Sequence, residues 1–413
     1  MANDLNNVKD VGGIIANAAA TMLADESQFC KTIRKADKTD YDGKNGYKAG
    51  DTIYVSKPAR FIPQETFDVT SSTQDITEED VALPLDIIST VGVEINSLEF
   101  ATEMELKSTI ERVIKPAVSS IAQNVDQRFL EKATDATYNS VGTAGSTTFA
   151  PDDILAAREK MNKFLCPKDN NRYFLHDSTA GRKAVGERKG LFQSSSEIAK
   201  QYKMGYVGMA DGFTWLESEL LNNHTNGNDV TGVAVNDASA ATGATTLAVD
   251  GLTTTTGTVK KGQVFTIAGV YAVHPITKET YTFLQQFTVT ADATANGSGE
   301  ATLSISPAIY SSASTSLQNV SALPANDAAL VFVGAASTAY TQNLAYHKEA
   351  FRGVSVPLIM PKRAEMAEQR TVDGITVAVI RDFDVLERRM VTRLDFLGGI
   401  TADRPEWSCR ITS

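Results

Sequence analysis

Residues 261–275 read Lys-Gly-Gln-Val-Phe-Thr-Ile-Ala-Gly-Val-Tyr-Ala-Val-His-Pro. Within this stretch Phe265 alternates with Ile267, and a little further on Phe287 alternates with Val289. Alternate side chains along a β-strand point to the same face, so this period of two predicts strands that bury one face. The pattern favours a folded β-domain over a disordered linker for the part of the chain around it.

The chemistry of the chain changes over residues 228–338, which surround these strands. Only 10 of these 111 residues are charged, whereas charged residues make up 22% of the whole chain. Turn-forming pairs such as Asp250-Gly251 separate six strand candidates. The candidates are residues 230–235, 245–249, 264–270, 281–290, 301–306 and 328–333. We predict a small β-barrel or sandwich inserted within another domain. Its expected core is Phe265, Ile267, Phe287, Val289 and Leu303.

The strongest helical pattern lies at residues 98–133. Its apolar side chains recur at spacings of three and four and form one stripe. The stripe consists of Leu106, Ile110, Val113, Ala117, Ile121, Val125 and Phe129. Pro116 is expected to kink or restart the helix. At roughly 1.5 Å per residue the helix would be about 50 Å long, so we expect it to form the spine of an extended domain.

Two strand patterns flank a long polar segment. Residues 51–56 and 81–87 alternate apolar with polar or small side chains. Roughly 25 mostly polar residues join them, a length that is unusual in a compact domain unless the loop is functional. We interpret the whole as an extended β-hairpin arm. Its charged residues are candidates for ion pairs between subunits, with a solvated loop as the alternative; they are Lys57, Arg60, Glu65, Asp68, Asp75, Glu78 and Glu79.

The remaining segments suggest that the chain leaves one domain, builds the barrel and returns. Residues 14–23 predict a short N-terminal helix, and Pro151 begins another helix with acidic residues in its first turn. Residues 340–360 have helix or loop character. The patterns at 375–379 and 390–396 predict strands near the C-terminus.

No motif of an enzyme or a cofactor site is present. The 413 residues are enough for two or three domains, but they contain no Walker A loop, dinucleotide-binding glycine pattern or nucleophile elbow. The four histidines share no ligand spacing, and the three cysteines form no CxxC pair. No stretch is long and apolar enough to span a membrane. We therefore expect no enzymatic activity, no cofactor and no metal.

The net charge of −11 argues against a protein that binds nucleic acid directly, because phosphate binding needs concentrated Lys and Arg. A wall that encloses nucleic acid without adsorbing it can be mildly acidic. The charge is therefore compatible with a container.

Segments spread along the chain resemble, in order, the coat-protein family of phage P twenty-two. Residues 261–275, Leu284-Gln-Gln-Phe-Thr-Val-Thr-Ala-Asp292 and Leu303-Ser-Ile-Ser-Pro-Ala-Ile309 are similar to the insertion domain of that family. Gly205-Tyr-Val-Gly-Met-Ala-Asp-Gly-Phe213 is similar to the A-domain turn before the insertion. Asn343-Leu-Ala-Tyr-His-Lys-Glu-Ala-Phe351, with Arg393-Leu-Asp and Asp403-Arg-Pro-Glu406, resembles the return into the A-domain and the last strands.

The resemblance implies an α+β chain with the Hong Kong 97-like capsid fold and an inserted small β-barrel. The implied ranges are an N-terminal arm at 1–42, the extended hairpin loop (E-loop) and P-domain strands at 43–95, the spine helix of the P-domain at 96–140, the A-domain at 141–227, the inserted barrel at 228–338, the A-domain return at 339–368 and C-terminal P-domain strands at 369–413.

The resemblance also implies a function. The chain would be a major capsid protein that folds in the host cytoplasm and self-assembles as hexamers and pentamers into the icosahedral head shell. The shell would enclose double-stranded DNA without sequence-specific binding. The implied partners are further copies of the chain and a portal protein, and a decoration protein is an optional further partner. No membrane is expected as a partner. The segment before the hairpin arm is too short for a fused scaffolding region, which implies a separate scaffolding protein. The stretch before Lys260 is short for the loop that bridges two-fold contacts in the family, so the resemblance leaves open whether the insertion domain makes such a bridge.

Other classes of protein compete with this interpretation. An encapsulin-type compartment shell shares the fold, but such shells usually lack an insertion like residues 228–338. A phage tail, decoration or adhesin protein would explain the Thr-rich segment but not the long helix or the returning strands. A glycosidase-type carboxylate pair meets only in space, so the sequence does not test for it.

Overall fold

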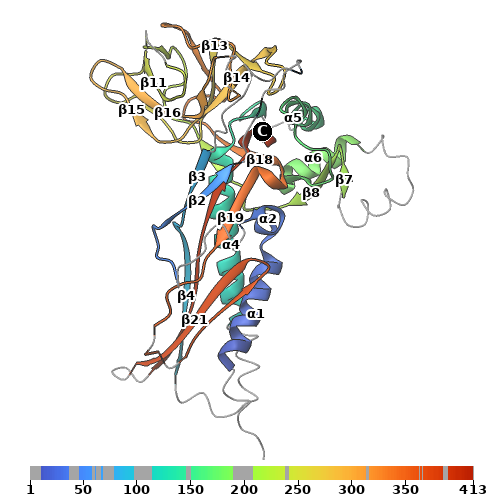
Figure 1. Ribbon diagram of the computed structural model, residues 1–413, viewed down its shortest axis with the longest axis vertical. Coiled ribbons are helices and arrows are strands. Elements are labelled where there is room, and N and C mark those ends of the chain that lie inside the picture. The colour runs from blue at the N-terminus through green and yellow to red at the C-terminus, as the bar shows by residue number, and fades with distance from the viewer. Residues whose placement is uncertain are drawn as a thin grey trace, which may run out of the picture. The chain divides into compact units, whose positions relative to one another are not determined.

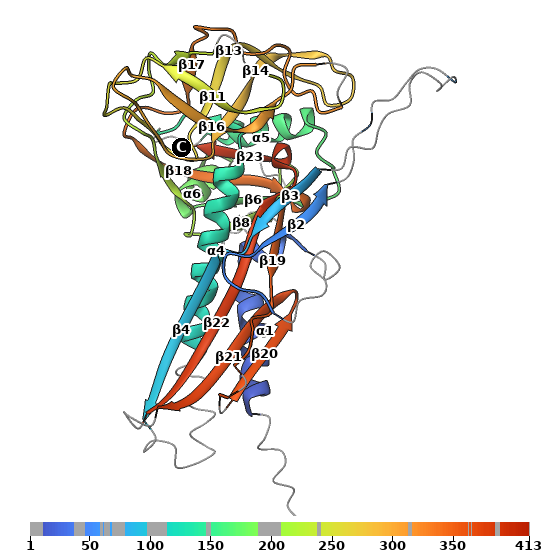
Figure 2. The same cartoon turned by 60° about the vertical axis from the view of Figure 1, so that its left-hand side comes forward.

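The computed structural model divides into two compact units (Figures 1 and 2). Unit 1 comprises Met1–Val55, Asp80–Leu130 and Phe351–Thr401, and unit 2 comprises Ser56–Glu79, Glu131–Ala350 and Ala402–Ser413. The structure describes residues 11–36, 46–57, 61, 67, 79–96, 114–145, 150–188, 208–237, 241–312, 316–361, 363–364, 366–384 and 389–412.

Unit 1 is built on a six-stranded sheet. Its strand order is β1 (Arg34–Lys35), β19 (Phe351–Ser355), β22 (Arg389–Ala402), β21 (Ile375–Asp384) and β20 (Met366–Val372), and β4 (Ile87–Asn96) also pairs with β22. The antiparallel register of β22 and β4 runs from Arg389↔Asn96 to Gly398↔Ile87, and Figure 2 shows the two strands side by side. The helix α1 (Val11–Glu26) packs against β20 and β21. It buries small and aliphatic side chains, namely Ala16, Ala19, Ala20 and Leu23.

The spine helix α4 extends over Lys115–Ala136. Pro116 lies in its first turn, where the missing N–H group costs no hydrogen bond. The predicted apolar stripe is buried at Ala117, Ile121, Val125 and Phe129. Its first three members, Leu106, Ile110 and Val113, lie outside the described residues.

The two strands expected at the hairpin arm are confirmed. They are β2 (Thr52–Lys57) and β3 (Glu79–Pro84), which form a two-stranded sheet. Ile53 and Val55 are buried in a cluster with Leu83, whereas Tyr54 is 66% exposed. This alternation is the pattern that predicted the strand.

Unit 2 contains a seven-stranded sheet. Its order is β5 (Ser140–Gly142), β23 (Ser408–Thr412), β18 (Ala339–His347), β6 (Arg172–His176), β8 (Phe213–Glu217) and β7 (Met209–Ala210), with β9 (Asn223–Thr225) also paired to β18. The helices α5 (Pro151–Lys163) and α6 (Ser178–Arg188) belong to the same unit. α5 begins at the predicted Pro151 and buries Ile154, Ala157 and Met161.

The helix or loop character expected for residues 340–360 is wrong for most of this range, which forms two strands. The chain there forms the strand β18, the short 3₁₀ helix η4 (Lys348–Ala350) and the strand β19. From Gln342 to His347 every residue of β18 is buried. A strand that is buried on both faces has no period of two, so the alternation that identifies half-buried strands is missing.

The strands within residues 369–413 do not all belong to one sheet. β20, β21 and β22 lie in the sheet of unit 1, but β23 lies between β5 and β18 in the sheet of unit 2. It pairs antiparallel with β18, for example Leu344↔Arg410, and parallel with β5 through Arg410↔Ser140. The sequence of β23 does not indicate which of the two sheets it joins.

The inserted segment forms a six-stranded barrel. The strand order is β10 (Ala234–Val235), β11 (Ala244–Asp250), β16 (Ala301–Ile309), β14 (Thr280–Val289), β13 (Val264–Val273) and β17 (Leu330–Phe332). A bridge between Ala234 and Ala329 joins the two ends of this order and closes the barrel. Each of the six strands overlaps one of the six predicted segments. The short strands β12 (Thr258–Val259) and β15 (Ala293–Thr294) were not predicted.

The barrel core contains the five predicted side chains. Phe265, Ile267, Phe287, Val289 and Leu303 are each 0% exposed and belong to one hydrophobic cluster. Phe265 and Phe287 face each other across β13 and β14, with ring centroids 5.8 Å apart. Stacked aromatic pairs of this kind add to the stabilisation from burial alone.

Truncation of Phe287 to alanine is expected to destabilise the barrel by about 3–5 kcal/mol, because it leaves a cavity in a closed core. Hydrogen exchange of the β11 and β16 amides in the full chain measures this loss. Val331→Ala is the control, because Val331 is 62% exposed on β17 and its truncation should change stability by no more than about 0.5 kcal/mol. Equal exchange rates in the two variants would contradict the assigned core.

Candidate functional site: the barrel junction and the arm anchor

The seven charged residues expected to pair between subunits are only partly described. Lys57 is the half-buried last residue of β2, and Glu79 is the first residue of β3. The other five lie outside the described residues; they are Arg60, Glu65, Asp68, Asp75 and Glu78. Pairing between subunits therefore stays a prediction.

A set of side chains that sequence reasoning did not identify joins the barrel to the sheet of unit 2. We call these contacts the barrel junction, and its members are Asp135, Ser140, Lys160, Lys163, Phe164, Lys261, Gly262, Tyr281, Phe283, Gln286, Thr288 and Arg410. They come from the end of α4, from β5, α5 and β23 on the sheet side, and from β14 and the β12–β13 turn on the barrel side.

Gln286 of β14 binds the backbone of Ser140. Its Nε2 donates to the Ser140 carbonyl at 3.0 Å, and its Oε1 accepts from the Ser140 N–H at 2.8 Å. The side-chain amide thus makes the same pair of bonds that a neighbouring strand would make. The Lys160 ammonium also donates to the Gln286 Oε1 and to the Ser140 carbonyl. Burial lowers the pKa of Lys160 to about 8, so the group remains largely protonated at neutral pH.

The start of β14 contacts the C-terminal end of α5. The Tyr281 hydroxyl donates to the Lys163 carbonyl at 2.8 Å, which is one of the carbonyls left without an intrahelical partner at a helix end. Phe283 packs edge to face on Phe164 with ring centroids 6.3 Å apart. The Lys163 ammonium lies 5.0 Å from the centre of the Phe283 ring. This part of the junction combines apolar and polar contacts.

Arg410 is fully buried on β23 and reaches three acceptors. Its Nη1 donates to the Gly262 carbonyl at 2.5 Å, and its Nη2 donates to the Asp135 carbonyl at 3.1 Å and to the Thr288 hydroxyl at 3.0 Å. The Thr288 hydroxyl in turn donates to the Asp135 carbonyl at 3.2 Å. One guanidinium therefore connects the end of α4, the β12–β13 turn and β14.

The turn before β13 approaches the end of α4 closely. The Lys261 ammonium pairs with the Asp135 carboxylate at 2.9 Å. Gly262 has φ +86°, and a Cβ atom there would lie 2.7 Å from the other Asp135 carboxylate oxygen. The turn therefore requires glycine at this position.

His224 lies beside this turn and is neutral. Burial and, to a smaller extent, the nearby charge of Arg410 lower its pKa to about 4. The histidine therefore adds no second positive charge beside Arg410 at neutral pH.

In unit 1 a buried carboxylate anchors the N-terminal segment to the spine helix. The Asp126 side chain on α4 accepts the backbone N–H groups of Phe29 and Cys30 at 3.0 and 3.1 Å. These residues lie in the first turn of α2 (Gln28–Thr32), so the carboxylate caps this helix from a distant part of the chain. Burial raises the pKa of Asp126 to about 6, although the backbone hydrogen bonds act in the opposite direction. We call this contact the arm anchor.

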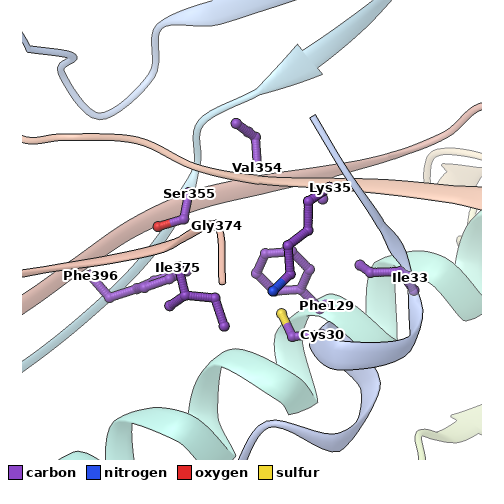
Figure 3. A pocket seen from close by; sticks show the side chains of 10 residues that line it. Cys30, Ile33, Lys35, Phe129, Val354, Ser355, Gly374, Ile375 and Phe396 are labelled. Atoms are coloured by element: carbon purple, nitrogen blue, oxygen red, sulfur yellow. The ribbon is translucent and has the colours of Figure 1, made fainter. Parts of the chain in front are cut away.

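A small cavity lies next to the arm anchor (Figure 3). It is lined by Cys30, Ile33, Lys35, Phe129, Gly353, Val354, Ser355, Gly374, Ile375 and Phe396. Its volume of about 10 Å³ is at the lower limit for a single water molecule. Burial and the charge of Asp126 raise the pKa of the Cys30 thiol, which keeps it protonated and unreactive. The cavity is too small for a substrate.

The described part of the chain offers no metal site and no membrane span. None of its groups of His, Cys, Asp and Glu side chains is arranged to hold a metal ion. No helix among the same residues is long and apolar enough to cross a membrane.

Comparisons with known proteins identify the family of this chain. Residues 25–409 match the sequence profile of the family described as "P22 coat protein - gene protein 5". The chain belongs to this family. It is a major coat protein of a phage capsid shell, a structural protein and not an enzyme. No curated protein sequence matches the chain significantly.

Solved structures similar to the coat protein include phage capsids. A structure from Mycobacterium phage Che8 is 11% identical with a TM-score of 0.46, and the match covers 93% of this chain and 90% of that one. The capsid of Ralstonia phage GP4 is 9% identical with a TM-score of 0.44 and coverage of 92% and 87%. The CUS-3 coat protein I-domain is 26% identical with a TM-score of 0.19, and the match covers 25% of this chain and 96% of that domain.

The arm anchor predicts a dependence of stability on pH. The pKa of Asp126 is raised in the folded state, so the folded protein holds this proton more tightly than the unfolded chain does. The stability that this tighter proton binding gives is fully present below the pKa of the carboxyl in the unfolded chain, about 4. It is lost as the pH rises through the folded-state pKa of about 6. Between pH 4 and 7.5 the free energy of unfolding of the wild type should fall by up to roughly 3 kcal/mol relative to that of Asp126→Asn, because the asparagine side chain does not titrate.

Urea unfolding of both proteins across this pH range measures the difference. A difference in unfolding free energy that is independent of pH would contradict the buried, titrating carboxylate. Asp25→Asn is the matched control, because it makes the same substitution at an exposed carboxylate near the end of α1.

Proposed function

We propose that the coat protein assembles as hexamers and pentamers into a closed icosahedral shell around phage double-stranded DNA. The family match over residues 25–409 carries this proposal, because it includes the arm, the spine helix, the barrel and the returning strands. Identical chains close into shells through repeated contacts of the same surfaces. The net charge of −11 fits a wall that encloses DNA without binding its sequence.

We also propose that assembly uses a separate scaffolding protein and a portal protein. One kind of subunit contact is compatible with several curvatures, so a second component is needed to select one closed size. A portal at one vertex would give the DNA an entry. A decoration protein is a further proposed partner on the finished shell, in which copies of the coat protein are the main components.

The proposed arm contacts are electrostatic. Lys57 and Arg60 precede the tip of the hairpin arm, and five acidic residues follow along it, namely Glu65, Asp68, Asp75, Glu78 and Glu79. Opposite charges on neighbouring arms would each contribute modestly, but repetition around a shell sums many such contacts.

Expression alone and together with the neighbouring genes tests the assembly proposal. We expect closed shells of one diameter by negative-stain electron microscopy in the second case, and irregular shells, tubes or spirals in the first. Particles that stay small under both conditions as concentration rises would refute it.

Charge reversal tests the arm contacts. Lys57→Glu combined with Arg60→Glu should prevent or slow assembly, because it places like charges together on neighbouring arms. Reversal of the acidic residues Glu78 and Glu79 to Lys in the same chain should restore shells, as judged by sedimentation. The control is Lys260→Glu, which reverses one charge of an exposed ion pair with Asp292 on the barrel and leaves the arm unchanged. Normal assembly of the doubly reversed arm would exclude the proposed pairs.

A further inference from the structure

The barrel is attached to the rest of unit 2 by two chain crossings. Asn226 lies at the first crossing and donates from its side-chain nitrogen to the carbonyls of Val333 and Ala335 at the second. The Ser337 N–H also donates to the Gly227 carbonyl at 3.0 Å. These bonds bring the two crossings together at one place. A domain attached at one place needs further contacts away from it if its orientation is to be fixed.

Arg410 is such a contact, and its chemistry is directional. The guanidinium is planar and holds its donors in a rigid fork, so all three acceptors must be in place together. Two of them, the Gly262 carbonyl and the Thr288 hydroxyl, belong to the barrel, and the third is the Asp135 carbonyl at the end of α4. A rotation of the barrel on the sheet would break the two barrel bonds.

The burial of Arg410 is costly for stability. The side chain is 0% exposed, and burial lowers its pKa to about 10, although the charge of Asp135 acts in the opposite direction. The carboxylate of Asp135 pairs with Lys261, and the hydrogen bonds of Arg410 are to two carbonyls and a hydroxyl. An apolar side chain of the same volume would avoid this desolvation cost. What the guanidinium supplies instead is a fixed geometry.

We propose that Arg410 is a positioning residue that holds the inserted barrel in one orientation on the A-domain, and that uniform shells require this orientation. The second half of the proposal rests on the proposed assembly function. The first half concerns the single chain and can be tested without assembly. Thr288, which connects Arg410 to the Asp135 carbonyl, is the barrel side of the same contact.

Hydrogen exchange of the full-length chain tests the orientation. Arg410→Met keeps an unbranched side chain about as long as the aliphatic part of arginine and removes the guanidinium with its charge and donors. The Ser140 N–H reports on docking, because its acceptor is Gln286 of the barrel. Its exchange should become about tenfold faster or more in the variant. The β11 and β16 amides, which lie inside the barrel, should exchange at the wild-type rate. Unchanged exchange at Ser140 overturns the proposal, and so does an equal acceleration inside the barrel, which would indicate a general loss of stability.

If Arg410→Met does not fold, a pair of substitutions at Thr288 tests whether this contact holds the orientation of the barrel. Thr288→Val removes the hydroxyl and keeps the shape, whereas Thr288→Ser keeps the hydroxyl. The valine variant should accelerate exchange at Ser140, and the serine variant should not. Identical exchange in the two variants overturns the proposal.

Electron microscopy of assembled particles tests the second half. Arg410→Met and Thr288→Val should give particles of mixed size or form under conditions in which the unchanged chain gives one form. Uniform shells from a variant with faster exchange at Ser140 overturn the link to shell form. If the unchanged chain forms no shells, the proposed function fails, and the exchange measurements still decide the role of Arg410.

Discussion

The strand β18 is the constraint on which unit 2 depends. It follows directly after the barrel and pairs with β23 on one side and with β6 and β9 on the other. Three parts of the chain that are far apart in sequence are thereby joined to one strand. Because β18 is buried on both faces and hydrogen-bonded along both edges, none of these partners can shift register without exposing or unpairing it. The chain can leave this sheet to form the barrel, because on its return β18 pairs with β23 and β6 in a single register.

Unit 2 contains two kinds of interaction, one that stabilises the barrel and one that orients it. The interior of the barrel is apolar, with Phe265 and Phe287 at its centre. Burial of such side chains stabilises the barrel but does not determine how it faces another domain, because hydrophobic attraction has no preferred direction. The barrel junction is instead rich in hydrogen bonds from Gln286, Tyr281 and Arg410. Hydrogen bonds depend steeply on distance and angle, so this surface is suited to fixing an orientation.

Buried charges occur in both units and are solvated by the backbone. In unit 1 the Asp126 carboxylate accepts two N–H groups of α2, and in unit 2 the Arg410 guanidinium donates to two carbonyls. Burial raises the pKa of Asp126 and lowers the pKa of Arg410, so in each case it favours the neutral form. Each charge therefore costs stability and at the same time ties a distant segment to a fixed element.

The sequence by itself determined the features that depend on near neighbours in the chain. The period of two in the charge-poor segment predicted the barrel strands and the core residue Phe287, and Pro151 predicted the start of α5. These patterns are local, because the side chains that share a face of a strand or helix are two to four residues apart. Tertiary structure alone decided that β18 is a strand, that β23 joins the sheet of unit 2, and that Arg410, Gln286 and Asp126 are anchors. β18 lacks an alternating pattern because both its faces are buried, and the partners of the three anchors lie about a hundred residues or more away in the sequence. Contacts over such separations leave no periodicity, so they exist only once the chain has folded.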